Sequence, residues 1–248
     1  MMADDGQLFG GMSDFSSPKQ AVLNITGGPL SYRYQVAQVQ LHFGDQDDKG
    51  SEHTINGTRF PAEVQILAFN SQLFRNSSDA AARAHGVVVV SVLVQVGTEN
   101  INPELRILTD AIEKIRFAGS YTWISSLSVQ GLLPPTDFYF TYEGSLTQPP
   151  CHETVTWLVL NKPIYATPAQ LKTLRKLHQG TARSPKAKMV NNFRPTQLLY
   201  HRPLRTNIDF TGPRSKSGAR KIAGHNSGQR GECPGMTRQM YYTAHSWR

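Results

Sequence analysis

VQLHFGDQDDKGSEH, residues 39–53, alternates apolar and polar positions and then breaks into a polar loop that contains glycine. Alternation with a period of two is typical of a half-buried β-strand, so Gln40 and His42 are predicted to leave the same face of one strand. The stretch PAEVQILAFN, which follows after a short loop, repeats the pattern and places Glu63 and Gln65 on one face. Two strands thus present polar side chains, and only one of these side chains is a histidine.

Strand patterns continue through most of the chain, so a mainly β (α+β) fold is predicted. Two helices interrupt them, at residues 102–117 and 167–180. In the first, Asn102 can cap the helix and Pro103 suits its first position. In the second, Thr167 and Gln170 form a capping box, and Gly180 is a stop signal. The strand signals are VAQVQLHFG (36–44), EVQILAFN (63–70), GVVVVSVLVQVG (86–97), DFYFTYEGSL (137–146) and TVTWLVLN (154–161).

The 248 residues, 39% of them hydrophobic, allow one large domain with a buried core. We predict a disordered leader at 1–20, a domain at 21–210 and a flexible basic tail at 211–248. The net charge of +8 is unevenly spread, since residues 1–169 hold 10 basic and 16 acidic residues and residues 170–248 hold 16 and 2. Such a cationic C-terminal third attracts acidic proteins, sulfated glycans or nucleic acid.

The longest apolar run, residues 87–96, is too short to span a membrane, so no membrane span is expected. The first twenty residues lack the apolar segment of a secretory signal, which predicts a cytoplasmic chain if it is translated in this form. Three N-glycosylation sequons, at Asn24, Asn56 and Asn76, have meaning only in a secreted protein.

Four long motifs resemble the alpha class of carbonic anhydrases, and they occur in that family's order. They are GGPLSYRYQVAQVQLHFGDQDDKGSEHTING, PAEVQILAFN, GSLTQPPCHETVTWLVL and NNFRPTQLLYHRPL. The resemblance covers about residues 20–210. It implies a large, mostly antiparallel twisted sheet of the alpha-carbonic anhydrase type with short surface helices, and it implies that the N-terminal part of that fold is missing.

The resemblance also implies a degenerate zinc site. An active member holds zinc with three imidazoles and leaves a fourth position for water. The matching positions here are Gln40, His42 and Gln65, so only one imidazole remains. A glutamine carbonyl suits zinc poorly, and therefore neither bound zinc nor carbon dioxide hydration is expected.

Other positions match parts of the family's machinery. Thr147 matches the hydroxyl that orients the zinc-bound group, Glu52 its carboxylate partner, and Glu63 the acid behind the third ligand. For these three we favour a buried polar network in which glutamine amides donate to the carboxylates. Three apolar residues match the family's hydrophobic pocket wall: Leu67, Val89 and Leu146.

Within the family, the pattern most resembles the acatalytic carbonic anhydrase-related proteins, in particular the secreted branch numbered ten and eleven. This implies an extracellular, neuronal glycoprotein that binds a cell-surface protein such as a neurexin. In that branch the cysteine at the position of Cys151 pairs with one in the N-terminal third, which has no counterpart here. Cys151 is therefore either a free thiol or unusually paired, and Cys233 is a candidate for an intermolecular disulfide.

Two alternatives stay open. The first is a zinc-dependent carbonate dehydratase with a non-standard metal site, or a hydratase or esterase that uses His42, Glu52 or Glu63 as ligands to a different metal. His53 is expected to be a poor substitute ligand, because it would lie on the opposite side of an extended strand from Glu52. The second is a polyanion-binding protein that uses the basic C-terminal third, although no module specific for nucleic acid is found.

Overall fold

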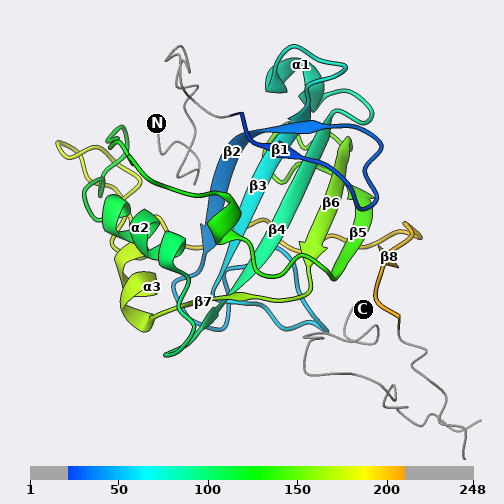
Figure 1. The fold of residues 1–248 in the computed structure, drawn as a ribbon. Helices are drawn as coiled ribbons and strands as arrows, with labels where there is room; N and C mark the ends of the chain where they lie inside the picture. The colour runs from blue at the N-terminus through cyan, green and yellow to red at the C-terminus, as the bar shows by residue number, and fades with distance from the viewer. Residues whose placement is uncertain (1–21, 210–248) are drawn as a thin grey trace, which may run out of the picture.

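The computed structural model describes residues 22–209, which form one twisted sheet with short helices at its margins (Figure 1). The predicted leader and tail lie outside the described residues. The helices are α1 (Ser77–Ala81), α2 (Pro103–Ile112), α3 (Pro168–Leu174) and the 3-10 helix η1 (Gln130–Leu132). The strands are β1 (Asn24–Ile25), β2 (Tyr34–Phe43), β3 (Ala62–Asn70), β4 (Val87–Val96), β5 (Tyr139–Gly144), β6 (Val155–Leu160), β7 (Ile164–Ala166) and β8 (Arg205–Thr206).

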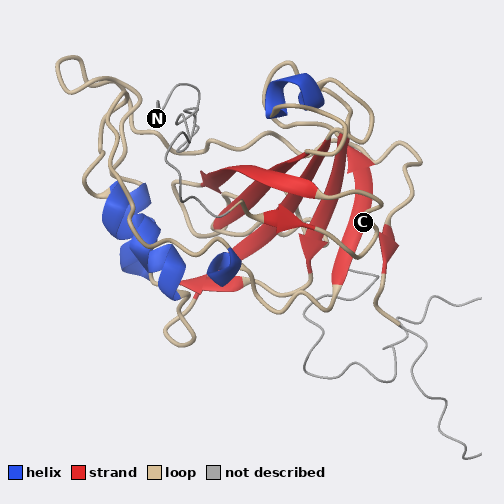
Figure 2. Cartoon of the chain, turned by 45° about the horizontal axis from the view of Figure 1, so that its top comes forward, coloured by secondary structure: helices blue, strands red, loops and turns tan. Residues whose placement is uncertain are grey.

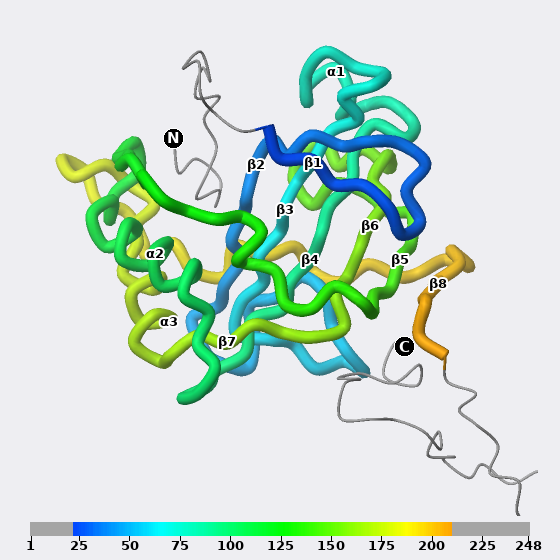
Figure 3. Tube along the Cα trace, in the orientation of Figure 1, coloured from blue at the N-terminus to red at the C-terminus, as the bar shows by residue number. Residues whose placement is uncertain are grey.

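The predicted mainly β class with short helices is confirmed. The strand order is β1-β2-β3-β4-β6-β5-β8, and β7 pairs with β4. Most pairs are antiparallel, but β4 runs parallel to both β6 and β7. A parallel pair needs a long crossover, and here α2, η1 and β5 lie between β4 and β6 in the chain (Figure 3). The valine-rich β4 is central and is buried over most of its length, as its continuous apolar run predicts.

One face of the sheet carries the main aliphatic core. Alternate residues of β3 and β4, such as Val64 and Val90, point to this face and meet the buried stripes of α2 and α3, including Leu108 and Leu171. The two helices lie together at the β7 side of the sheet (Figures 1 and 2). The opposite face carries the polar residues of β2 and β3, so the two faces differ in chemistry.

A β-bulge in β2 sets which residues reach the polar face. Val36 pairs with Ala68 and Gln38 pairs with Leu67, which leaves Ala37 as an extra residue without a partner on β3. Before the bulge the even-numbered Val36 packs on the aliphatic core, whereas after it the odd-numbered residues do so. The bulge therefore directs the even-numbered residues that follow it to the polar face.

Both predicted helices begin where their caps place them. Asn102 accepts from the backbone N–H of Leu105, and the capping box of Thr167 and Gln170 is present. Both helices end earlier than predicted, at Ile112 and Leu174, and each continues as a tight turn with i to i+3 hydrogen bonds.

No helix within residues 22–209 has the length and apolar character required to cross a membrane.

Candidate functional site

The three positions singled out in the sequence lie together on the polar face of the sheet. Gln40 on β2 pairs directly with Gln65 on β3, and His42 pairs directly with Glu63. Directly opposed residues on antiparallel strands have Cβ atoms about 5 Å apart. The four side chains therefore form a compact square, and all four are nearly inaccessible to solvent.

The amide of Gln65 is held between two carboxylates. Its Nε2 donates to Glu52 Oε2 at 2.8 Å and to Glu63 Oε1 at 3.0 Å. These are the amide-to-carboxylate hydrogen bonds that the sequence predicted. The amide of Gln40 behaves differently, because its Nε2 donates to Oε1 of Gln148 at 3.3 Å.

His42 keeps a nitrogen lone pair inside the site. Its Nδ1 lies 2.6 Å from the backbone oxygen of Asn192, which can only accept, so Nδ1 carries the proton. In the neutral ring the lone pair is then on Nε2, which within residues 22–209 is a buried atom without a hydrogen-bond partner. His42 is thus in the tautomer of a metal ligand.

Glu63 is the centre of the network. It is fully buried, and its two oxygens accept from five donors. Ser91, a buried hydroxyl in the valine-rich β4, donates to Oε1 at 2.8 Å. The other donors are the Gln65 amide, the backbone N–H groups of Glu52 and His53, and Nδ1 of His53. A buried carboxylate with this many donors is satisfied in its ionised form.

The structure corrects the expectation for His53. Residues 52 and 53 lie in a bend and not in an extended strand, and the ring of His53 turns toward the network. Nδ1 donates to Glu63 Oε1 at 2.8 Å, and Nε2 lies 2.7 Å from the hydroxyl of Tyr142. The ring also packs edge-on against Trp157, with centroids 4.8 Å apart. Sequence analysis missed this contact, and His53 joins β3 to β5 and β6.

The opposite charges of Glu63 and His53 shift the pKa values of both residues. Burial would raise the pKa of Glu63, but the adjacent His53 outweighs it and lowers that pKa to about 2. Burial would lower the pKa of His53, but the charge and hydrogen bond of Glu63 outweigh it and raise that pKa. Burial raises the pKa of Tyr142, so its hydroxyl stays protonated. The pair therefore favours imidazolium and carboxylate.

These shifts predict how the free energy of unfolding depends on pH. The Glu63 contribution is present above that residue's ordinary pKa of 4.5 and is lost as pH falls toward about 2. The His53 contribution is present below its ordinary pKa of 6.5 and is lost as pH rises through the raised value. Urea unfolding at about pH 5.5 and about pH 8.5 should show a loss of stability at the higher pH that is smaller in His53→Gln. Equal losses in both proteins would contradict this prediction.

The sequence profile of the eukaryotic-type carbonic anhydrases matches residues 9–208, more than half of the chain. The chain belongs to this family. The match begins twelve residues before the predicted domain boundary at residue 21.

Named relatives agree with this assignment. Carbonic anhydrase-like protein 2 of Caenorhabditis elegans is 44% identical over 202 residues, covering 80% of this chain and 60% of the relative. Carbonic anhydrase-like protein 1 of the same organism is 42% identical over 204 residues, covering 82% and 55%. Carbonic anhydrase 7 of Homo sapiens is 38% identical over 184 residues, covering 74% and 69%. The chain thus spans less than two thirds of the length of either nematode relative.

The residues at the carbonic anhydrase ligand positions do not fit zinc. They offer one imidazole and two carboxamides, and both amide nitrogens already donate to other side chains. The neighbouring carboxylates of Glu52 and Glu63 also accept hydrogen bonds on both of their oxygens. Within the described part of the chain, no group of three or more His, Cys, Asp or Glu side chains is arranged to hold a metal.

Thr147 and Glu52 are not joined as the resemblance implied. Glu52 accepts from Gln65 and from the backbone N–H of Arg194 at 2.8 Å. In the described residues the half-buried Thr147 makes no hydrogen bond with Glu52. Glu52 therefore belongs to the polar network, whereas Thr147 stands apart from it.

The three residues matched to the carbonic anhydrase pocket wall do gather. Leu67, Val89 and Leu146 belong to one apolar cluster, together with the buried ring of Trp157. This cluster lies on the same face of the sheet as Gln65, because Leu67 follows Gln65 by two positions on β3. The apolar wall and the polar network thus adjoin.

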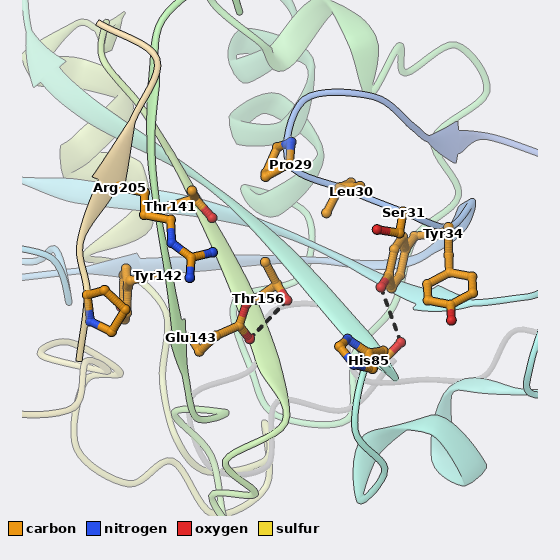
Figure 4. A pocket seen from close by; sticks show the side chains of 12 residues that line it. Pro29, Leu30, Ser31, Tyr34, His85, Thr141, Tyr142, Glu143, Thr156 and Arg205 are labelled. Atoms are coloured by element: carbon orange, nitrogen blue, oxygen red, sulfur yellow. Dashed lines mark hydrogen bonds between the residues drawn. The ribbon is translucent and has the colours of Figure 1, made fainter.

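A cavity of about 310 Å³ lies elsewhere, on the opposite face of the sheet (Figure 4). Thr156 Oγ1 donates to the Glu143 carboxylate, and the Tyr34 hydroxyl donates to the backbone oxygen of His85. Thr156 precedes Trp157 on β6, so their side chains point to opposite faces. The cavity contains none of the ligand positions, and its lining is Pro29, Leu30, Ser31, Tyr32, Tyr34, His85, Thr141, Tyr142, Glu143, Thr156, Pro203 and Arg205.

The candidate modification sites are placed as follows. Asn24, Asn56 and Asn76 are all exposed, and Asn76 also caps α1 by accepting from the N–H of Asp79. Cys151 is half-buried and forms no disulfide within residues 22–209. Cys233 lies outside the described residues.

Proposed function

We propose that this chain is an acatalytic carbonic anhydrase-like domain that acts by binding a protein partner outside the cell. The observation that carries the proposal is the state of the ligand positions. Gln65 is fixed by Glu52 and Glu63, and Gln40 by Gln148, so hydrogen bonds inside the protein engage the groups that replace two imidazoles. Such an arrangement satisfies buried polar groups without a metal.

The extracellular part of the proposal rests on other features. All three sequons are exposed, as glycan attachment requires. The motifs resemble the secreted carbonic anhydrase-related proteins ten and eleven, and two relatives are named carbonic anhydrase-like proteins. We propose a neuronal cell-surface protein of the neurexin kind as the partner. Saturable binding to a purified neurexin ectodomain would support this choice, and its absence would remove it.

Zinc content tests the acatalytic assignment directly. We expect far less than one zinc per chain after dialysis of the folded, monodisperse protein against a mild chelator, because a single imidazole does not retain the ion. Elemental analysis gives the ratio, and stopped-flow carbon dioxide hydration on the same sample should match the uncatalysed rate. One retained zinc per chain together with hydration would favour the alternative, a carbonate dehydratase with a non-standard site.

A further inference from the structure

One end of the molecule combines positive charge with exposed aromatic rings. We call it the cationic end and define it as residues 114–123 and 172–188. These two segments contain eight basic residues and no acidic ones. In Figures 1 and 2 the loops that follow α2 and α3 project at the end of the molecule farthest from β8.

Backbone hydrogen bonds hold the two segments side by side. His178 N–H donates to Arg116 O at 2.8 Å, and Ala118 N–H donates to Gly180 O at 3.0 Å. Gln179 N–H donates to Ala187 O at 3.0 Å, which folds the second segment back as a hairpin. The basic residues of both segments therefore belong to one hydrogen-bonded backbone structure.

Five of the eight basic side chains are exposed and form no ion pair with any residue in 22–209. Arg116 and Lys176 bind Glu113, and Arg175 binds Asp47. Four of the five remaining cations are lysines, which act as compact point charges. The five are Lys114, Lys172, Arg183, Lys186 and Lys188.

Two large aromatic side chains of the cationic end are exposed to solvent. Trp123 is 84% exposed and Tyr121 is 67% exposed. Tyr121 is three residues from Ala118 and Trp123 is five, so their Cα atoms lie within about 11 and 18 Å of the point where the segments join. Contact of an apolar ring with water is unfavourable, so covering these rings with a partner would contribute favourable free energy to binding.

We propose that the cationic end binds a sulfated polysaccharide. Its sulfates would lie against the lysines, and a sugar ring would lie flat on Trp123 or Tyr121 through its C–H face. A long linear polyanion reaches spaced cations on a projecting hairpin without needing a complementary protein surface. Two other partner classes fit less well. Lysine is depleted in protein–protein interfaces, and binders of single-stranded nucleic acid use a series of aromatic rings along a groove.

Titration with a heparin octasaccharide tests this proposal in the full chain. Lys186→Ala/Lys188→Ala should weaken binding about tenfold and reduce the slope of log Kd against log salt by about 2. Arg75→Ala/Arg83→Ala removes two exposed cations near α1 and is the matched control, which should leave binding nearly unchanged. Trp123→Ser should weaken binding at every salt concentration, whereas Leu73→Ser, at another exposed apolar residue, should not.

Two results of these titrations would overturn the proposal. Equal losses in the lysine pair and its control would overturn the proposal, because binding would then follow overall charge or residues outside 22–209. Equal competition by oligo-dT or polyglutamate of similar charge would also overturn it in favour of a general polyanion site. The inference rests on the proposed binding function. A chain that retains no zinc and does not bind heparin would contradict the inference but not the acatalytic assignment.

Discussion

Replacing His53 by alanine is expected to lower the free energy of unfolding by about 3 to 5 kcal/mol, because the change removes one partner of a buried charge pair. Glu63 is fully buried, and His53 supplies both its nearest positive charge and a 2.8 Å hydrogen bond. The hydroxyl of Tyr142 loses its partner at the same time. An unpaired buried charge costs far more than an exposed one. Chemical denaturation monitored by tryptophan fluorescence gives the difference.

His152→Ala is the matched control for this variant. His152 is also a partly buried histidine, but its side chain makes no hydrogen bond or ion pair with the described residues. Its loss should cost less than about 1 kcal/mol. His53→Gln keeps an amide that can donate to Glu63 and should recover part of the loss. A His53→Ala variant as stable as the control would show that the network contributes little.

Restoring two histidines is expected to restore zinc binding. In Gln40→His/Gln65→His, three imidazoles would stand on one face of β2 and β3, and the zinc-to-chain ratio should rise to about one. His42 is already oriented for this role, since Nδ1 donates to the oxygen of Asn192 and Nε2 is buried without a hydrogen-bond partner in residues 22–209. Glu52 and Glu63, which now accept from the Gln65 amide, can accept an imidazole N–H there. Elemental analysis after dialysis against a mild chelator measures the gain.

Two further variants make this result specific. Gln40→Asn/Gln65→Asn changes the same positions without adding imidazoles and should stay free of zinc. Adding His42→Ala to the restored protein should reduce zinc retention again, because two imidazoles hold the ion much more weakly than three. A restored protein that is folded but takes up no zinc would show that the pocket itself, and not only its donor set, differs from that of an active carbonic anhydrase.

The sequence predicted those parts of the fold that local patterns decide. The valine run of β4 and the capping residues Asn102 and Thr167 act over a few positions, and each element formed where it was expected. The predicted C-terminal ends of α2 and α3 were wrong, because contacts between residues far apart in the sequence decide where these helices end. Residues 116–118 pair with residues 178–180, and this pairing draws both segments out of helical geometry. No periodicity within either segment contains that information.

The site was predictable to a similar degree. The period of two placed Gln40 and His42 on one face, and the family resemblance indicated Gln65 as their neighbour. His53 was misplaced because its backbone was assumed to be extended, whereas a bend turns its ring toward Glu63. Ser91 did carry a signal, since a single hydroxyl in a buried apolar strand must find a partner.

The extra residue in β2 gives this strand one position that it can lose without a change of register. Without Ala37, Val36 and Gln38 would be consecutive and could pair with Ala68 and Leu67 as in a regular antiparallel strand, so the residues on either side would keep their faces. An insertion after Gln40 has no such slack, because with the earlier pairing kept it would place Leu41 opposite Glu63 and turn the imidazole of His42 toward the aliphatic core. Histidine and glutamine can replace each other in this frame, whereas one added residue would exchange the two sides of the end of the strand.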